Sequence, residues 1–216
     1  MEIPLFPLRT VLFPGMPLPL QIFEERYRVM TRELLASGAE FGVLLIREGK
    51  EVGGGAIPFE VGTTARIEEC EELPGGRFAM TARGMRRFRL VQMLPARPYP
   101  FGRVELMDDA EVLTPQALRA SETVRATFPL YFRLALSLTD QWAQGMKLPE
   151  RPHALVNFLA PWLQIDEEAK QRLLEVEAPA DRVAHLAELL DDLLARTREE
   201  VVEYRRRKFA GIGSGN

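Results

Sequence analysis

The side chains that most often carry catalysis are few in this sequence. The two histidines are His153 and His185, the single cysteine is Cys70, and serine occurs four times. His185 and Glu188 stand three apart, a spacing that helical metal sites use, but two ligands are too few for a metal centre. No serine lies in a G-x-S-x-G elbow, and the glycines near Lys50 lack the spacing of a phosphate-binding loop. The sequence therefore predicts no catalytic centre, no cofactor and no metal site.

Two groups of charged residues in the first half of the chain could bind an oppositely charged group. An acidic group flanks a predicted hairpin turn and could hold a cation, although charges at such turns are usually solvated. It comprises Glu68, Glu69, Glu71 and Glu72. A basic group follows, comprising Arg83, Arg86, Arg87 and Arg89. Arg87 and Arg89 would share a strand face and could contact an anion or an acidic peptide, but pairing with the glutamates across the hairpin is the simpler interpretation.

Composition and charge limit the class of protein. The 216 residues are 46% hydrophobic and 27% charged, which is ordinary for a folded chain. The net charge of -3 is evenly spread and the basic run at 205–208 is short, so we expect neither nucleic acid nor a membrane as partner. One cysteine excludes an intramolecular disulfide and suits a reducing compartment. Without a secretory signal or a long apolar run, the sequence predicts a cytoplasmic location.

Short apolar runs separated by turn signals predict a β-rich subdomain over residues 1–113. The prolines in segment 2–27 suit edge strands and strand starts, because proline cannot donate to a ladder. Apolar residues at helical spacing predict one helix here, with a buried face of Phe23, Tyr27, Met30 and Leu34. We therefore expect a small antiparallel β-barrel or sheet with one inserted helix.

Helical periodicity predicts an α-helical subdomain over residues 114–210. Thr114 and Pro115 are typical of a helix N-terminus, and Pro129 predicts a bend or break. From Pro179 we expect a final helix of about 29 residues that packs on its first half and projects on its second. The fold class is thus α+β, a β subdomain followed by a helical bundle that ends in a long helix, with a disordered tail at 211–216.

The segment "IPLFPLRTVLFPGMPLPLQIFEERYRVM" at 3–30 resembles the start of the amino-terminal (LON) domain of ATP-dependent Lon proteases, where a proline-bearing segment leads into a charged helix. The stretch "VGTTARIEECEELPGGRFAMTARGMRRFRL" at 61–90 is similar to a second family motif through Gly62, Thr63, Pro74, Gly76, Gly84 and Arg87. "YPFGRVELM" fits the strand that closes the family's β part, and residues 155–194 resemble its helical subdomain.

The resemblance implies a domain that recognises protein substrates or partners. In the full proteases this region precedes an ATPase module and a serine–lysine peptidase domain, and neither follows here before Asn216. We therefore expect a stand-alone LON domain protein that is not an enzyme. An ATP-dependent protease acting in trans is a further expected partner. The family's substrate contacts are not a fixed motif, so the resemblance transfers no site residues.

Three hypotheses for function stay open. The leading one is a non-catalytic module that binds polypeptide segments at its edge strands, with Phe13, Met16 and Arg87 as contacts. Phe13 and Met16 flank the Pro14-Gly15 turn, where they could equally close the core. The second is a small-ligand-binding or enzymatic protein that uses the crevice between the β and α subdomains. The third is self-association through the apolar stripe of the last helix.

Overall fold

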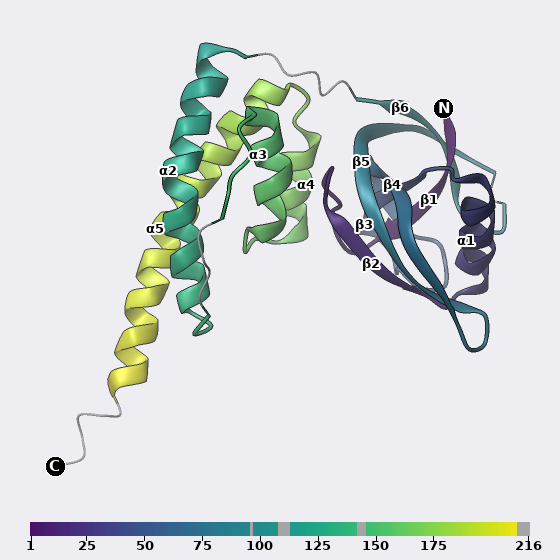
Figure 1. Ribbon diagram of the computed structural model, residues 1–216, viewed down its shortest axis with the longest axis horizontal. Helices are drawn as coiled ribbons and strands as arrows, with labels where there is room; N and C mark the ends of the chain where they lie inside the picture. Colours follow the sequence, from purple (N-terminus) through teal and green to yellow (C-terminus); the bar gives the residue numbers. More distant parts are fainter. Residues whose placement is uncertain (96, 108–112, 142–145, 211–216) are drawn as a thin grey trace. The chain divides into compact units, whose positions relative to one another are not determined.

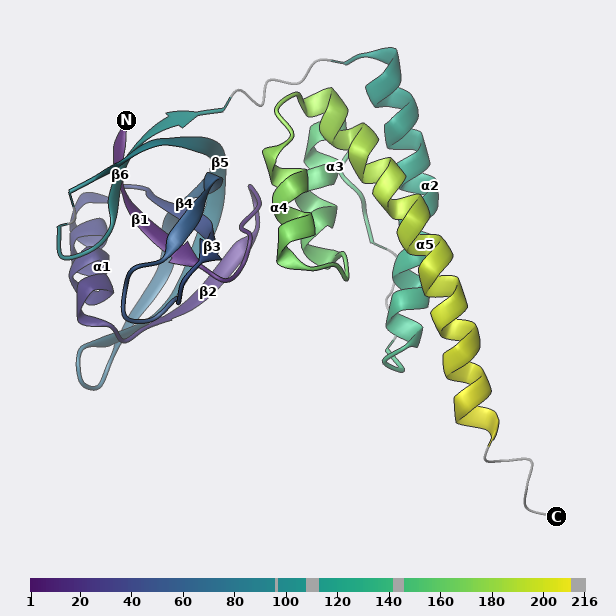
Figure 2. The ribbon, with the colours of Figure 1, turned by 180° about the vertical axis from the view of Figure 1, so that it is seen from behind.

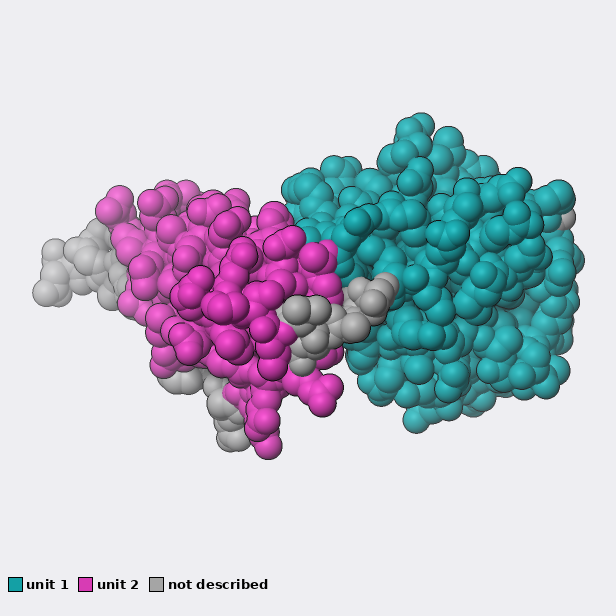
Figure 3. Space-filling view, turned by 90° about the horizontal axis from the view of Figure 1, so that it is seen from above, with its two compact units in different colours: residues 1–110, 165–177 teal, residues 111–164, 178–216 magenta. Residues whose placement is uncertain are grey.

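The computed structural model describes residues 1–95, 97–107, 113–141 and 146–210. Contacts divide the chain into two compact units, which are coloured separately in Figure 3. Unit 1 comprises Met1–Ala110 and Ile165–Glu177, and unit 2 comprises Glu111–Gln164 and Ala178–Asn216. Residues 165–177 therefore lie among the helical residues in sequence but pack with the strands. The division into separate domains at 113 and 114 stays a prediction, and the predicted tail at 211–216 lies outside the described residues.

Unit 1 is a six-stranded sheet with two helices, labelled in Figure 1. Its elements are β1 (Glu2–Leu8), β2 (Pro17–Ile22), α1 (Glu25–Ser37), β3 (Phe41–Glu48), β4 (Ile57–Leu73), β5 (Arg77–Leu94), β6 (Phe101–Leu106) and α4 (Glu167–Glu175). The strand order is β2-β5-β4-β3-β1-β6, and β5 also pairs with β6. Five strands thus close into a ring, and β2 is added outside it on β5. The pairings are antiparallel except for the parallel β1–β3 pair, which confirms the predicted α+β class.

The apolar runs form strands where both faces can be buried. In β3, residues Phe41 to Ile46 are all buried, as expected for a central strand. Strand β1 pairs on both sides, with β3 and with β6, so the prediction of an edge strand is wrong for β1 and right for β2. Pro4 lies near the start of β1, as expected for proline, but Pro7 lies one residue before its end and pairs with Leu44 of β3.

Helix α1 begins two residues later than its apolar stripe predicts. Tyr27, Met30 and Leu34 are buried, as expected, and Gly38 ends the helix in the left-handed conformation that glycine adopts readily. Phe23 precedes the helix and is 56% exposed, so its assignment to the buried face was wrong. A side chain before the first turn does not follow the periodicity of the helix, which explains the error.

Two glycines allow segments of unit 1 to approach more closely than any other residue would permit. A Cβ atom on Gly62 would lie 2.2 Å from the Val43 carbonyl oxygen, and one on Gly84 would lie 2.3 Å from the Phe13 carbonyl oxygen. Both separations are far below van der Waals contact, so a side chain would push the strands apart. Gly62 and Gly84 therefore fix how β4 and β5 meet their neighbours.

Unit 2 is a helical bundle of α2 (Pro115–Ser137), α3 (Pro152–Leu159), the 3-10 turn η1 (Ala160–Trp162) and α5 (Pro179–Ala210). Both ribbon views show α2 and α5 side by side (Figures 1 and 2). The Thr114 hydroxyl accepts a hydrogen bond from the Ala117 amide at 3.0 Å, which confirms the predicted cap. Pro129 lies inside α2, which continues without a break from Pro115 to Ser137, so the predicted division of this segment is wrong.

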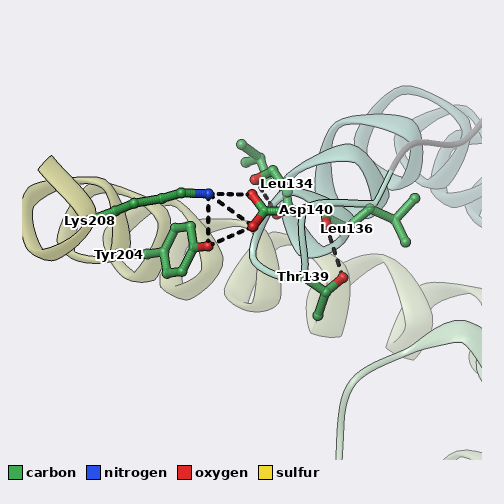
Figure 4. A network of polar contacts seen from close by, with 7 residues as sticks. Leu134, Leu136, Thr139, Asp140, Tyr204 and Lys208 are labelled. Atoms are coloured by element: carbon green, nitrogen blue, oxygen red, sulfur yellow. Dashed lines mark hydrogen bonds and ion pairs between the residues drawn. The ribbon is translucent and has the colours of Figure 1, made fainter.

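The far half of α5 is held by polar contacts rather than projecting freely. Val201 is buried, and beyond it the Lys208 ammonium lies 2.7 Å from a carboxylate oxygen of Asp140, just after α2 (Figure 4). The Tyr204 hydroxyl donates to the same carboxylate at 3.1 Å. These hydrogen bonds lower the pKa of Asp140, with the Lys208 bond as the larger cause. The expectation of a projecting second half is therefore wrong as far as Lys208.

We expect the substitution Asp140→Asn to loosen the last turns of α5. Amide hydrogen exchange at residues 201–208 should become about two- to fivefold faster, because an exposed ion pair contributes little but acts where the helix frays. Since the pKa of Asp140 is lowered in the folded state, the wild-type protection should be complete near neutral pH. It should be lost only as the pH falls below the ordinary aspartate pKa of 3.8. Glu203→Gln removes an exposed pair with Arg207 on α5 alone and is the matched control. Equal exchange in the two variants would contradict the assignment.

Candidate functional site

The structure places the three predicted contact residues in different surroundings. Phe13 and Arg87 are 0% exposed, and Met16 is half-buried against the main hydrophobic core of unit 1. Neither Phe13 nor Arg87 presents a side chain to solvent, so each could influence binding only by positioning the residues around it. Their direct contact with a peptide stays a prediction.

The guanidinium of Arg87 lies at the C-terminus of α4. It donates to the carbonyl oxygens of Leu174 and Val176, both at 2.6 Å, and to that of Glu177 at 3.0 Å. The last carbonyls of a helix have no partner within the helix and carry its negative end charge, so a cation is stabilising there. Arg87 thus joins β5 to the segment at 165–177.

Two further polar contacts hold α4 against the strands. The Val11 amide donates to the Glu167 carboxylate at 2.6 Å, near the first turn of α4. The Gln171 side chain, which is buried, donates to the Val61 carbonyl at 2.9 Å. The predicted pairing of the arginine group with glutamates across the hairpin holds for Arg83, which contacts Glu68, but not for Arg87.

Strand β2 is the free edge of the sheet in the described residues, because it pairs with β5 alone. At the start of this pairing the Gly84 amide donates to the Met16 carbonyl at 3.0 Å. Antiparallel pairs alternate between hydrogen-bonded and non-bonded, so every second residue of β2 directs its backbone away from β5: Pro17, Pro19 and Gln21. The two prolines have no N–H. The edge therefore offers the carbonyls of Pro17 and Pro19, and its outward donor is the Gln21 amide.

An apolar pocket of about 160 Å³ lies beside β2 on the side of the sheet that faces the core. Its walls include the buried residues Phe6, Ile22 and Tyr27, and burial raises the pKa of Tyr27 to about 12. At its rim, Phe23 and Val52 are 56% and 55% exposed. The phenol of Tyr27 stays neutral across the physiological range, whereas Glu24 and Glu51 add two carboxylates to a lining that is otherwise mainly apolar. The pocket is suited to one apolar side chain.

The opposite face of the same strands carries an open groove. Leu20, Met80 and Cys70 are aligned across β2, β5 and β4 and pack toward the core. The neighbouring rows therefore point outward and border a depression of about 540 Å³. These rows are Pro19, Thr81 and Glu69, and Gln21, Ala79 and Glu71. We call this depression the β5 groove.

Sequence reasoning missed Phe23 and Val52 as site residues, and of the two outward rows of the β5 groove it identified only Glu69 and Glu71, as part of the acidic group. A signal existed for Val52, an isolated apolar residue in a glycine-rich loop, which is typical of a side chain with a specific contact. The groove could not be read from the sequence, because it depends on which residues of three strands stand in register.

The remaining candidates give no sign of chemistry. Burial is the main cause that raises the pKa of the Cys70 thiol, and the nearby Glu72 carboxylate adds to it, so the reactive thiolate is disfavoured. Over the described residues, no group of three or more histidine, cysteine, aspartate or glutamate side chains could hold a metal ion. Searched over the same ranges, no helix combines the length and the apolar character needed to cross a bilayer.

Comparison with known proteins connects this geometry to a family. The family profile described as "ATP-dependent protease La (LON) substrate-binding domain" matches residues 2–192. The Lon protease of Syntrophus aciditrophicus is 28% identical over 184 residues, which is 80% of this chain and 23% of that protein. The Lon protease of Porphyromonas gingivalis is 25% identical over 228 residues, which is 96% of this chain and 26% of that protein. The chain thus spans about a quarter of the length of these relatives.

Two solved structures share the fold. A Lon N-terminal domain protein from Xanthomonas campestris superposes with a TM-score of 0.64 at 26% identity, covering 86% of this chain and 96% of that one. The N-terminal domain of a Lon protease from the Mycobacterium avium complex gives a TM-score of 0.64 at 18% identity, covering 89% and 99%. The second likeness bears on the fold alone.

We expect Arg87→Met to release the segment at 165–177 from the strands. The variant loses three hydrogen bonds from a charged donor, each of which contributes about 1.5–3 kcal/mol when buried, so the free energy of unfolding should fall by several kcal/mol. Arg89→Met is the matched control, since Arg89 lies on the same strand and contacts the exposed Glu177 carboxylate. Its loss should be within about 1 kcal/mol. Chemical denaturation and hydrogen exchange at 165–177 check both, and similar losses in the two variants would contradict the anchoring role.

Proposed function

Because the chain belongs to the family of ATP-dependent protease La (LON) substrate-binding domains, we propose that it recognises and holds polypeptide segments without cutting them. The observation that carries this proposal is the apolar pocket beside β2, whose rim residues Phe23 and Val52 are more than half exposed. A pocket of this kind on a sheet edge is suited to an apolar side chain of an extended polypeptide.

The size of the pocket limits what it binds. A volume of about 160 Å³ takes one large apolar side chain and is far below the roughly 300–1,000 Å³ of pockets that enclose small-molecule ligands. Phe23 precedes α1 and Val52 lies in the loop after β3, so the rim is built from two connections next to the strand edge. A polypeptide that follows β2 can therefore place one apolar residue between them.

The edge itself contributes less than a regular strand would. A peptide that adds to a sheet edge exchanges N–H and C=O groups with it, but Pro17 and Pro19 offer acceptors only. Long ladders of backbone hydrogen bonds cannot form along β2. We infer that side-chain contacts select the polypeptide and that the edge carbonyls assist, which modifies the edge-addition mechanism expected from the sequence.

We also propose that this chain leaves cleavage to another protein, an ATP-dependent protease acting in trans. What supports this is the family match, which is to a substrate-binding domain, together with the raised pKa of the Cys70 thiol, which disfavours the reactive thiolate. The relatives named above are proteases of about four times the matched length, and their activity is theirs.

We expect Phe23→Ser to weaken peptide binding. A suitable probe is a labelled 12-residue peptide with one central phenylalanine among glycine and serine, measured by fluorescence anisotropy. Loss of an exposed aromatic contact should raise the Kd about 5- to 30-fold, and Val52→Ser should have a smaller effect in the same direction. Leu35→Ser, at a half-exposed leucine on α1 outside the pocket, is the control and should leave the Kd unchanged. Equal binding by all three variants and the wild type would refute the pocket.

Self-association through α5 is a second proposed interaction. Val202 is exposed on this helix among charges of both signs, namely Arg198, Glu199, Glu203 and Arg206. Two antiparallel copies of such a face can pair opposite charges around the apolar residue. We expect the mass measured by light scattering to exceed that of one chain and to fall to one chain in Val202→Glu. A single-chain mass for the wild type at high concentration would exclude this interface.

A further inference from the structure

In the β5 groove, the outward face of β5 carries arginines at its two ends but none in the middle, beside the glutamates of β4. Along the outward face of β5 the residues are Arg77, Ala79, Thr81 and Arg83, with a cation at each end and two short side chains between them. On β4, beside the two short side chains, stand the carboxylates of Glu71 and Glu69. The groove therefore lies over the two short side chains, Ala79 and Thr81.

Arg83 shows how a guanidinium is held on this face. Its Nε donates to the Glu68 carboxylate at 2.5 Å, and its Nη1 donates to the Gly15 carbonyl oxygen at 2.9 Å. One cation thus connects a carboxylate of β4 to a carbonyl just before β2, across β5. The hydrogen bond with Arg83 lowers the pKa of Glu68, as expected for a carboxylate that is stabilised in its charged form.

The next two rows carry the carboxylates of Glu69 and Glu71 on β4, but β5 places no cation beside them. Glu69 and Glu71 are exposed, and neither makes an ion pair or a hydrogen bond to another described residue. The carbonyls of Pro17 and Pro19 point away from β5, so they lie along the open edge of the sheet beside the groove and not within it. Lysine and arginine side chains are donors only and carry positive charge, so they complement the carboxylates of Glu69 and Glu71.

The spacing of these acceptors fits an extended chain. Glu69 and Glu71 are two residues apart on a strand, which separates them by about 6.5 Å, and alternate side chains of an extended peptide recur at the same interval. Residues 19–21 of β2 border both the β5 groove and the apolar pocket, so one polypeptide that crosses this edge can reach both.

We propose that the β5 groove selects polypeptide segments with two basic side chains in alternate positions, close to the apolar residue that enters the pocket. This inference rests on the proposed function and specifies its substrate class. Glu69 and Glu71 pair with the two incoming cations in the way that Glu68 pairs with Arg83. The pairs are exposed, so their effect depends on ionic strength.

The test compares peptides that differ only in the two alternate positions. Three labelled peptides share one central phenylalanine and a glycine–serine background, and carry lysine, glutamine or glutamate at two positions separated by one residue. We expect the lysine peptide to bind about 3- to 10-fold more tightly than the glutamine peptide at low salt, and the glutamate peptide to bind more weakly than either. The preference should largely disappear in about 0.5 M salt. A lysine peptide with adjacent lysines should lose part of it.

Protein variants locate the effect. The double variant Glu69→Gln/Glu71→Gln should bind the lysine and glutamine peptides equally. The control variant Glu60→Gln/Glu105→Gln removes the same charge from two exposed glutamates elsewhere in unit 1, one on β4 and one on β6. It should keep the preference for the lysine peptide. Thr81→Arg supplies a cation within the groove, as Arg83 does one row away, and should remove the preference for the lysine peptide. Circular dichroism confirms that each variant is folded.

The outcomes separate this inference from the proposed function. Equal binding of the lysine and glutamine peptides by the wild type would overturn the inference and leave peptide binding in place. A preference that survives Glu69→Gln/Glu71→Gln would overturn the groove as its origin. A preference abolished by about 1 mM magnesium chloride, but not by the equivalent ionic strength of sodium chloride, would assign the groove to a divalent cation instead. Failure of all peptides to bind would overturn both proposals.

Discussion

The arrangement of unit 1 depends on one buried cation. Arg87 lies on β5, has no exposed surface and donates to three carbonyl oxygens at the end of α4. A buried charge must be compensated locally, and here the compensation comes from the negative end of a helix that is 87 residues away in sequence. The same contact explains why residues 165–177 pack with the strands although their neighbours in sequence belong to unit 2. The chain therefore passes between the two units three times, and not once.

The residues that carry the family resemblance prove to be residues that build the fold. Gly62 and Gly84 allow strands to approach within distances that no side chain permits, and Arg87 attaches α4. Such positions tolerate few substitutes for steric and electrostatic reasons. This is why a resemblance based on them predicted the α+β fold well and said little about where a partner binds. The surface residues of the pocket and the groove, such as Phe23 and Glu69, are under no comparable constraint from the fold.

A feature of the fold could be predicted from the sequence when the residues that determine it are close together in the chain. Helix caps are local, and Thr114 caps α2 as its place before Pro115 predicts; Asp166 caps α4 in the same way, by accepting from the Ala169 amide. Burial of an element that returns from far along the chain is not local, so neither the role of Arg87 nor the docking of α4 could be read from periodicity. The β5 groove requires the register of three strands and a bulge between Ile67 and Glu69 that sets which glutamates face outward. A one-residue change in that register would turn Glu69 and Glu71 to the other face.

The prolines of β2 link the two faces of the proposed site. A regular edge strand with both donors and acceptors invites any extended chain, including a second copy of the protein, and therefore discriminates poorly. Removing the donors at Pro17 and Pro19 weakens that general pairing and leaves recognition to side chains. One apolar side chain contributes about 1.5–3 kcal/mol and an exposed ion pair about 0.2–1 kcal/mol, whereas micromolar binding requires about 8 kcal/mol. Under the proposed function, a single site of this design would bind weakly and release quickly. Tight holding would then require several segments of one polypeptide to engage several copies of the domain, because linked weak sites gain affinity through effective concentration.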